Sequence, residues 1–204
     1  MNNIVVYCGS NLGETPLYVE AARGLGEAIA QRGSRLVYGG GRIGLMGTVA
    51  DAVLQAGGEV VGVIPTFLRE KEVAHHGLTE LIETPDMPSR KNKMIELGDA
   101  FIALAGGIGT FEELFEVLSL AQLKQHRKPI GLVNTAGFYD PLLSLLQQTA
   151  AQGFMPIANL SLLCVADTPQ ELLVKLENYQ PHDAPKWIQP AWLTEQTANT
   201  KVAP

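Results

Sequence analysis

Residues 100–113 read Ala-Phe-Ile-Ala-Leu-Ala-Gly-Gly-Ile-Gly-Thr-Phe-Glu-Glu. The apolar run Ala100–Leu104 is typical of a strand that is buried on both faces of a parallel sheet. Three glycines within the next five residues predict a turn whose backbone a ligand can approach closely. Phe111–Gln125 then has the apolar spacing of an amphipathic helix. A strand, a glycine-rich turn and a helix in this order form the repeating unit of an α/β fold.

The same order of elements continues on both sides of this stretch. We expect strands at Ile4–Cys8, Arg35–Tyr38, Val60–Ile64, Leu78–Glu83, Ala100–Leu104, Ile130–Val133 and Leu162–Val165. We expect helices at Pro16–Arg32, Leu45–Ala56, Arg90–Leu97, Phe111–Gln125, Tyr139–Gln152 and Pro169–Glu177. This alternation predicts an α/β, Rossmann-like fold: a doubly wound, mostly parallel sheet with helices on both faces. Residues 1–178 are expected to form a single domain, and the proline and small polar residues of 179–204 predict a loose C-terminal tail.

Composition limits the classes of function. The chain has 204 residues, of which 46% are hydrophobic and 18% charged, as in a folded globular domain. Its 15 basic and 21 acidic residues give a net charge of −6, which argues against a nucleic-acid or membrane surface. We find no signal-peptide pattern and no apolar run long enough to span a bilayer, so we expect a cytoplasmic protein. Cys8 and Cys164 lie in apolar runs and are expected to be reduced and buried.

Three glycine-bearing segments follow predicted strands, at the edge of the sheet where α/β proteins bind ligands. They are residues 8–13, 39–47 and 105–110. The second contains a G-x-G-x-x-G pattern that begins at Gly39, but the next strand ends in Pro65 and not in the acidic residue that would hold the ribose of NAD. Two interpretations therefore remain for this segment: a ligand-binding loop, or a tight turn with close helix packing.

The third segment gives the sharper prediction. Backbone amides and the Thr110 hydroxyl at the start of a helix would form a cradle for a monophosphate. Thr110 could instead be a helix N-cap, with Glu113 completing a capping box three residues later. Arg90 and Lys91 stand at another predicted helix start, where cations oppose the helix dipole. A bound phosphate would explain them, and so would simple exposure to solvent.

Other chemistries have little support in the sequence. His75 and His76 are adjacent, no third ligand lies at metal-binding spacing, and a solvated loop is the expectation for both. Ser10 has no nearby histidine in sequence, and the chain has no G-x-S-x-G motif, so a serine hydrolase is not expected. We expect neither a metal nor a cofactor.

Taken together, these motifs resemble the Lonely Guy family, whose members are often labelled lysine decarboxylase-like. The family signature is M-H-x-R-K followed by P-G-G-x-G-T-x-x-E. Here Met87–Lys91 and Ala105–Glu113 stand in these places. Further similarity extends in order and at family spacing from about Ile4 to Leu176, including Asn134 and Tyr139-Asp140.

The resemblance implies a phosphoribohydrolase, in which water cleaves the N-glycosidic bond of a nucleoside 5′-monophosphate to give a free base and ribose 5-phosphate. Cytokinin riboside 5′-monophosphate or adenosine monophosphate would be the substrate, and the enzyme would be a homodimer with its sites near the interface. Arg90 and Glu113 take the catalytic positions. The substrate-binding positions fall on Glu72, Lys91, Gly106, Gly107, Ile108, Gly109, Thr110, Glu112, Gly9, Ser10, Gly40, Gly41 and Met46.

Two residues depart from the family pattern. Ala105 stands in place of a proline, which should loosen the turn, and Pro88 replaces a histidine beside Arg90, which bears on substrate choice. Two other functions stay open at this point: a non-catalytic nucleotide-binding module and, with less support, a nicotinamide-dependent oxidoreductase. A decarboxylase would need a pyridoxal site, and no local context singles out a Schiff-base lysine.

Overall fold

The computed structural model describes residues 1–69, 74–181 and 187. Seven strands form one parallel sheet in the order β4-β3-β2-β1-β5-β6-β7. Their bounds are β1 Asn3–Tyr7, β2 Arg35–Tyr38, β3 Val60–Pro65, β4 Glu80–Thr84, β5 Ala100–Ala103, β6 Ile130–Val133 and β7 Leu163–Ala166. The α/β class and the parallel sheet are therefore as expected from the sequence, with small shifts at strand ends.

Seven α-helices and two short 3₁₀ helices join these strands in the described part of the chain. The α-helices are α1 Pro16–Gln31, α2 Gly44–Gln55, α3 Thr66–Arg69, α4 Met87–Leu97, α5 Ile108–Gln122, α6 Asp140–Ala151 and α7 Pro169–Glu177. The 3₁₀ helices are η1 Thr135–Gly137 and η2 Ile157–Leu162. The sequence did not indicate α3, which is only one turn long.

Two helices, α4 and α5, begin three residues earlier than predicted, and both carry functional residues. α4 begins at Met87, three residues earlier than expected, because Asp86 is its N-cap and the Asp86 carboxylate accepts a hydrogen bond of 2.8 Å from the Ser89 N–H. α5 begins at Ile108, and its N-cap is Gly107, which has no side chain to cap it. Thr110 lies inside the first turn of α5, so the capping-box interpretation of Thr110 and Glu113 is wrong.

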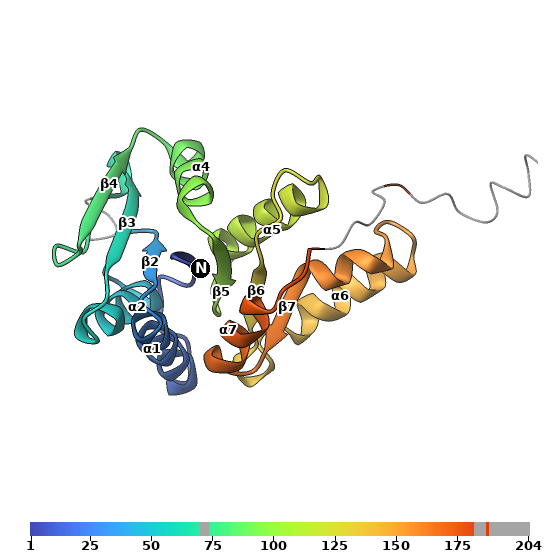
Figure 1. Cartoon of the computed structure of the whole chain (residues 1–204), viewed down its shortest axis with the longest axis horizontal. Helices are drawn as coiled ribbons and strands as arrows, with labels where there is room; N and C mark the ends of the chain where they lie inside the picture. The colour runs from blue at the N-terminus through green and yellow to red at the C-terminus, as the bar shows by residue number, and fades with distance from the viewer. Residues whose placement is uncertain (70–73, 182–186, 188–204) are drawn as a thin grey trace, which may run out of the picture.

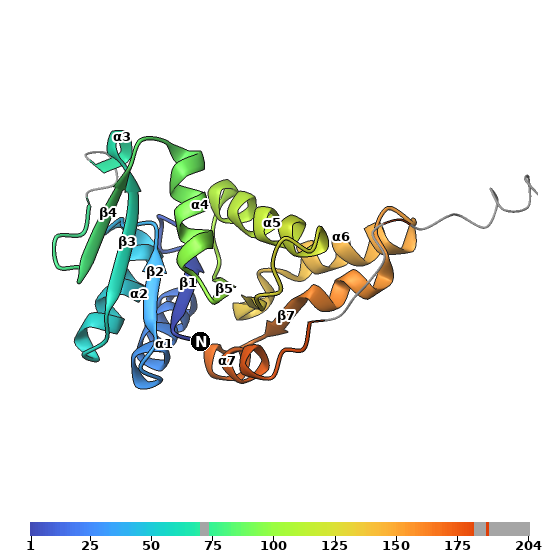
Figure 2. The same ribbon diagram turned by 45° about the horizontal axis from the view of Figure 1, so that its top comes forward.

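The helices cover both faces of the sheet (Figure 1). On one face α1, α2 and α7 pack against strand residues such as Ile4 and Val6. On the other, α4, α5 and α6 pack against their neighbours in sequence, Val5 and Tyr7. Figure 2 shows the two layers of helices with the sheet between them. Alternate residues of one strand thus face different cores, as expected of a sheet that is buried on both sides.

The chain reverses its direction across the sheet between β1 and β5. From β1 the strands are added outward as β2, β3 and β4, and β5 then pairs with the other edge of β1. Beyond the carboxyl ends of two such strands, the connecting loops diverge and leave a crevice. The segments that follow Tyr7 and Ala103 meet there. No helix in the described residues is long and apolar enough to cross a bilayer.

Candidate active site

A cavity of about 260 Å³ lies in the crevice beyond the ends of β1 and β5, and ten of the predicted site residues line it. They are Gly9, Ser10, Met46, Arg90, Gly107, Ile108, Gly109, Thr110, Glu112 and Glu113. Cys8, Leu68 and Met87 complete the lining. The tertiary fold therefore brings together residues from the ends of β1 and β5 and from the starts of α2, α4 and α5.

Residues Gly106–Thr110 are called the glycine loop below, and four of them, 107–110, line this cavity. The first N–H groups of a helix have no acceptor within the helix, so the start of α5 offers unpaired donors and the positive end of its dipole. A β-carbon added to Gly107 or Gly109 would meet nothing within 4 Å, so both positions face open space. A bound anion can approach these amides without interference from a side chain.

Gly106 has a different role in the same loop. A β-carbon there would stand 2.7 Å from the Thr110 Cβ and 2.9 Å from the Gly9 backbone nitrogen. The neighbouring Ala105 carbonyl accepts a hydrogen bond of 3.0 Å from the Gly9 N–H. Gly106 is thus required for the close approach of the two strand-end segments, and it also lines a second cavity beside the first.

The second cavity has a volume of about 280 Å³ and shares Gly9, Ser10 and Gly107 with the first. The rest of its lining combines aromatic, aliphatic and small residues: Asn11, Leu12, Gly13, Tyr18, Leu45, Ala105, Gly106 and Phe138. The two cavities therefore adjoin along the end of β1 and the glycine loop.

Arg90 is a buried cation, with 5% of its surface exposed. Its Nε donates to the Val63 carbonyl at 3.1 Å, and its Nη2 donates to the Gly39 carbonyl at 3.1 Å. Nη1 makes a weaker contact of 3.6 Å with the Met87 sulfur. Two neutral backbone carbonyls therefore hold the guanidinium in one position. The Arg90 side chain lines the cavity as a fixed positive charge.

The glycine cluster that follows β2 supports this arrangement by close packing. The carbonyl of Gly39 faces Arg90, and Gly40 adopts a positive φ of 80°. A β-carbon on Gly47 would lie 1.9 Å from the Arg42 carbonyl oxygen. Gly40 and Gly41, predicted to bind substrate, do not line the cavity. These contacts favour the interpretation of the cluster as a tight turn with close helix packing.

The Glu113 carboxylate influences two buried groups at the end of β1. Burial raises the pKa of the Tyr7 phenol, Glu113 and Glu116 raise it further, and Arg90 opposes them. Burial likewise raises the pKa of the Cys8 thiol, and the Glu113 charge adds to the effect. Both groups therefore stay protonated at neutral pH. Cys8 lines the cavity as a neutral thiol and not as a nucleophilic thiolate.

Lys91, predicted to bind substrate, lies beside the cavity lining and joins α4 to α5. Its ammonium pairs with Glu112, and it lies 3.3 Å from Glu116 Oε2. The hydrogen bond with Glu112 is the main cause that raises the Lys91 pKa. This ion pair links the residues next to Arg90 and Glu113 across the two helices. Glu72, the remaining predicted site residue, lies outside the described residues.

The expectation that His75 lies in a solvated loop is wrong. Only 7% of its surface is exposed, and its Nε2 lies 2.9 Å from Asp51 Oδ1. Its Nδ1 accepts a hydrogen bond from the Gly77 N–H, so Nε2 carries the proton. The backbone N–H of His75 donates to the Gly40 carbonyl. Local sequence could not show this, because Asp51 lies on a different element. Among the described residues, no group of three or more His, Cys, Asp or Glu could hold a metal ion.

Comparison with known proteins places the chain in a family. The family model described as possible lysine decarboxylase matches residues 46–176, more than half of the chain. A protein of Rhodococcoides fascians named cytokinin riboside 5′-monophosphate phosphoribohydrolase is 52% identical over 164 residues, 80% of this chain and 83% of its own. The rice (Oryza sativa subsp. japonica) protein of that name, LOG, is 47% identical over 178 residues, 87% of this chain and 74% of its own.

Solved structures support the fold. A molybdenum cofactor carrier protein from Chlamydomonas reinhardtii superposes with a TM-score of 0.65 at 21% identity, over 86% of this chain and 96% of its own. A molybdenum cofactor binding protein from Rippkaea orientalis gives 0.63 at 24% identity, over 87% and 96%. At this level of identity the likeness concerns the fold alone. The family match and the close relatives decide the identity: this chain belongs to the Lonely Guy (LOG) family, to which the possible lysine decarboxylase model corresponds.

Proposed function

We propose that this protein is a phosphoribohydrolase. Water cleaves the N-glycosidic bond of a nucleoside 5′-monophosphate, either a cytokinin riboside 5′-monophosphate or adenosine monophosphate, and releases the free base and ribose 5-phosphate. One observation carries the proposal: unpaired helix amides, a buried arginine and a carboxylate line the same cavity. The names of relatives that are 47% and 52% identical support the same reaction.

The glycine loop binds the 5′-phosphate in this proposal. Gly107 and Gly109 leave room for an anion against the backbone, and the start of α5 supplies donors and dipole. The phosphate is remote from the bond that breaks, so its binding energy serves to hold the sugar in place for attack. Thr110, buried at the base of the loop, and Ser10, at the end of β1, complete the phosphate end of the cavity.

Glu113 acts at the ribose. When the bond from C1′ to the base nitrogen lengthens, positive charge develops on the sugar, and a nearby carboxylate stabilises that charge. The electron pair of the bond leaves with the base, the water oxygen bonds to C1′, and one water proton ends on the base. Glu113 can also orient that water or accept its proton. The carboxylate has no such task in a protein that only binds nucleotide.

Arg90 holds the phosphate or the ribose and helps to fix Glu113. Its Nε and Nη2 are occupied by backbone carbonyls, so the side chain cannot follow a mobile ligand and presents a fixed charge instead. An arginine side chain is always a cation in proteins, so we assign Arg90 no role as general acid. Glu72, Lys91, Glu112 and Met46 are proposed as further substrate-binding residues, as the family resemblance implies.

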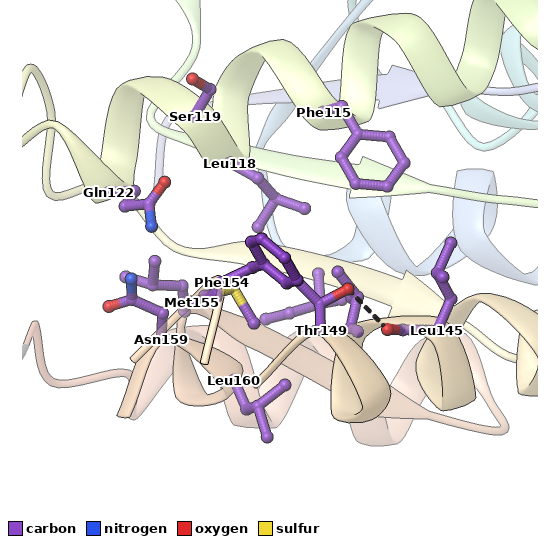
Figure 3. A pocket seen from close by; sticks show the side chains of 13 residues that line it. Phe115, Leu118, Ser119, Gln122, Leu145, Thr149, Phe154, Met155, Asn159 and Leu160 are labelled. Atoms are coloured by element: carbon purple, nitrogen blue, oxygen red, sulfur yellow. Dashed lines mark hydrogen bonds between the residues drawn. The ribbon is translucent and has the colours of Figure 1, made fainter. Parts of the chain in front are cut away.

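We also propose that the protein is a cytoplasmic homodimer, with a second copy of the chain covering an apolar groove next to the site. The groove has a volume of about 320 Å³ and lies between α5, α6 and the segment leading into η2. Figure 3 shows the rings of Phe115 and Phe154 projecting into it. Phe154 is 86% exposed and Leu145 58%. Phe115 and Glu113 both lie on α5, so a partner on this groove would contact the helix that carries Glu113.

The reaction is tested by incubating the purified full chain with adenosine monophosphate and separating the products by chromatography. Free adenine and ribose 5-phosphate in equal amounts are expected, and a cytokinin riboside 5′-monophosphate should give its own free base. Tight nucleotide binding with no released base would instead identify a non-catalytic nucleotide-binding module. Stabilisation of the fold against heat by NAD or NADP, and not by nucleoside monophosphates, would identify an oxidoreductase.

A further inference from the structure

Tyr139 contacts the chain on both sides of the glycine loop. Its hydroxyl donates a hydrogen bond of 2.6 Å to the carbonyl of Leu104, two residues before the loop. Its ring packs edge-on against that of Phe111, which directly follows the loop, with ring centroids 6.3 Å apart and an interplanar angle of 72°. Tyr139 is 1% exposed and does not line the cavity. It therefore acts on the loop from behind.

The hydrogen bond to Leu104 compensates for a break in the sheet. The Leu104 N–H donates to the Tyr7 carbonyl, and a regular parallel ladder would continue with the Gly9 N–H donating to the Leu104 carbonyl. The Gly9 N–H instead reaches one residue further, to the Ala105 carbonyl at 3.0 Å. The Leu104 carbonyl, in a residue that is 1% exposed, receives its donor from Tyr139. The slip and the hydroxyl together decide where the loop leaves β5.

Tyr139 is itself held by a network of hydrogen bonds. Its N–H donates to Asn134 Oδ1 at 2.7 Å, and Asn134 Nδ2 donates to Asp140 Oδ1 at 2.8 Å. The Asn134 N–H donates to the Ala166 carbonyl on the neighbouring strand. Burial raises the pKa of the Tyr139 phenol, so the hydroxyl remains a donor at neutral pH. The donor to Leu104 is thus fixed in position through β6 and β7.

We propose that Tyr139 is a positioning residue for phosphate binding: its hydroxyl and ring fix both ends of the glycine loop and so aim the amides at the start of α5. The inference rests on the proposed function, since it assigns the 5′-phosphate to those amides. Tyr139 touches no substrate in this arrangement. Its loss should weaken the binding of phosphate-bearing ligands and leave the binding of the base unchanged.

The test is Tyr139→Phe in the full chain, which removes one hydroxyl and keeps the ring against Phe111. Binding of ribose 5-phosphate and of free adenine is measured separately by calorimetry. A group misplaced by about 1 Å can lower the activity of a site by about 100-fold. We therefore expect ribose 5-phosphate to bind about tenfold more weakly or worse, and the affinity for adenine to stay unchanged. The KM for adenosine monophosphate should rise by more than kcat falls.

Two further variants separate positioning from general stability. Tyr179→Phe is the matched control, because Tyr179 follows α7 and its hydroxyl makes no hydrogen bond among the described residues. It should bind both ligands as the wild type does. Asn134→Ala removes the acceptor of the Tyr139 N–H and should give the same selective loss of ribose 5-phosphate binding, in a protein whose folding is checked by circular dichroism.

Unchanged binding of ribose 5-phosphate by Tyr139→Phe would overturn the inference. So would an equal loss for ribose 5-phosphate and adenine, which would mark a purely structural role. The proposed function fails separately: a wild-type protein that binds ribose 5-phosphate but releases no base would contradict the hydrolase while leaving the positioning role testable by binding alone. Base release without measurable ribose 5-phosphate binding would overturn the inference and not the reaction.

Discussion

The guanidinium of Arg90 occupies the space that a side chain at Gly39 would need. A β-carbon on Gly39 would lie 2.0 Å from Arg90 Nη2, and the Gly39 carbonyl accepts a hydrogen bond from that same nitrogen. Gly39, the first glycine of the cluster after β2, therefore makes room for the side chain of Arg90, a proposed catalytic residue on α4. Because backbone fixes the charge, Arg90 cannot shift without breaking two buried hydrogen bonds.

Gly39→Ala should displace Arg90 and lower kcat/KM for adenosine monophosphate by about 100-fold or more. The same clash should lower the free energy of unfolding by about 1–3 kcal/mol, as for other overpacked cores. Gly24→Ala is the control, because Gly24 lies inside α1 and its added β-carbon would make only an ordinary contact, 3.6 Å from Gln170 Nε2. It should raise stability by about 0.5–1 kcal/mol and leave activity intact. Full activity in Gly39→Ala would contradict the role of Arg90.

Glu113→Gln should reduce kcat by roughly 100-fold or more with the fold unchanged, since it removes the charge that stabilises the developing cation on ribose. Ribose 5-phosphate binding should persist, because the loop amides remain. The control is Glu27→Gln, which neutralises an exposed carboxylate on α1. Steady-state assays of adenine release, with unfolding curves for both variants, would decide the matter. A Glu113→Gln protein as active as the control would exclude a catalytic carboxylate at this position.

Two neighbouring glycines should respond in opposite ways to the same change. Gly107→Ala places a methyl group in open space at the cavity, so it should raise the KM for adenosine monophosphate, and it should cost under about 1 kcal/mol of unfolding free energy, because alanine is a poorer N-cap than glycine. Gly106→Ala forces a methyl group against Thr110 and Gly9, so it should cost about 1–3 kcal/mol of unfolding free energy. Urea unfolding and KM measurements on the pair serve as mutual controls. Equal destabilisation would mean that the loop is not open at Gly107.

The cap of α4 should give the protein a pH-dependent stability. Hydrogen bonds from Ser89 lower the pKa of the Asp86 carboxyl below its ordinary 3.8. A lowered pKa stabilises the folded state above the unfolded pKa, and this contribution is lost as the pH falls through the folded value. Asp86→Ala should therefore lower the melting temperature at pH 7, and the difference from wild type should shrink below pH 3.8. Asp86→Asn keeps an acceptor for the Ser89 N–H, so its melting temperature at pH 7 should lie closer to that of the wild type, and it should lack the part of the pH dependence that the Asp86 carboxyl contributes.

The proposed dimer predicts a change of mass in solution. Phe154→Asp places a charge on the apolar groove and should convert a dimer into a monomer in light scattering after gel filtration, because an unpaired buried charge is costly. Val174→Asp is the matched control, since Val174 is 50% exposed on α7, on the other face of the sheet. It should remain dimeric. A monomeric wild-type protein would show the proposed partner to be wrong.

Much of the fold follows from local pattern. Runs such as Ala100–Ala103 are apolar at consecutive positions because both faces of the sheet are covered, and the glycines that follow must form turns. Seven strands and six of the helices were therefore predictable, as was the glycine loop. The family resemblance also predicted that Arg90 and Glu113 belong to one site, and both line the same cavity. Helix starts were less predictable. At α4 the N-cap Asp86 lies before the first residues with helical apolar spacing, and at α5 the N-cap is Gly107, which has no side chain to signal it.

From the residue order alone, alternating strands, glycine turns and helices can be predicted, and Arg90, Glu112 and Glu113 stand out as candidate site residues. Which distant groups meet depends on the fold. Tyr139 behind Leu104, His75 against Asp51 and Gly39 beneath Arg90 join elements that are far apart in the chain. Such hydrogen bonds depend on where the strand order reverses and where helices pack against one another. The local spacing of apolar residues predicts neither of these.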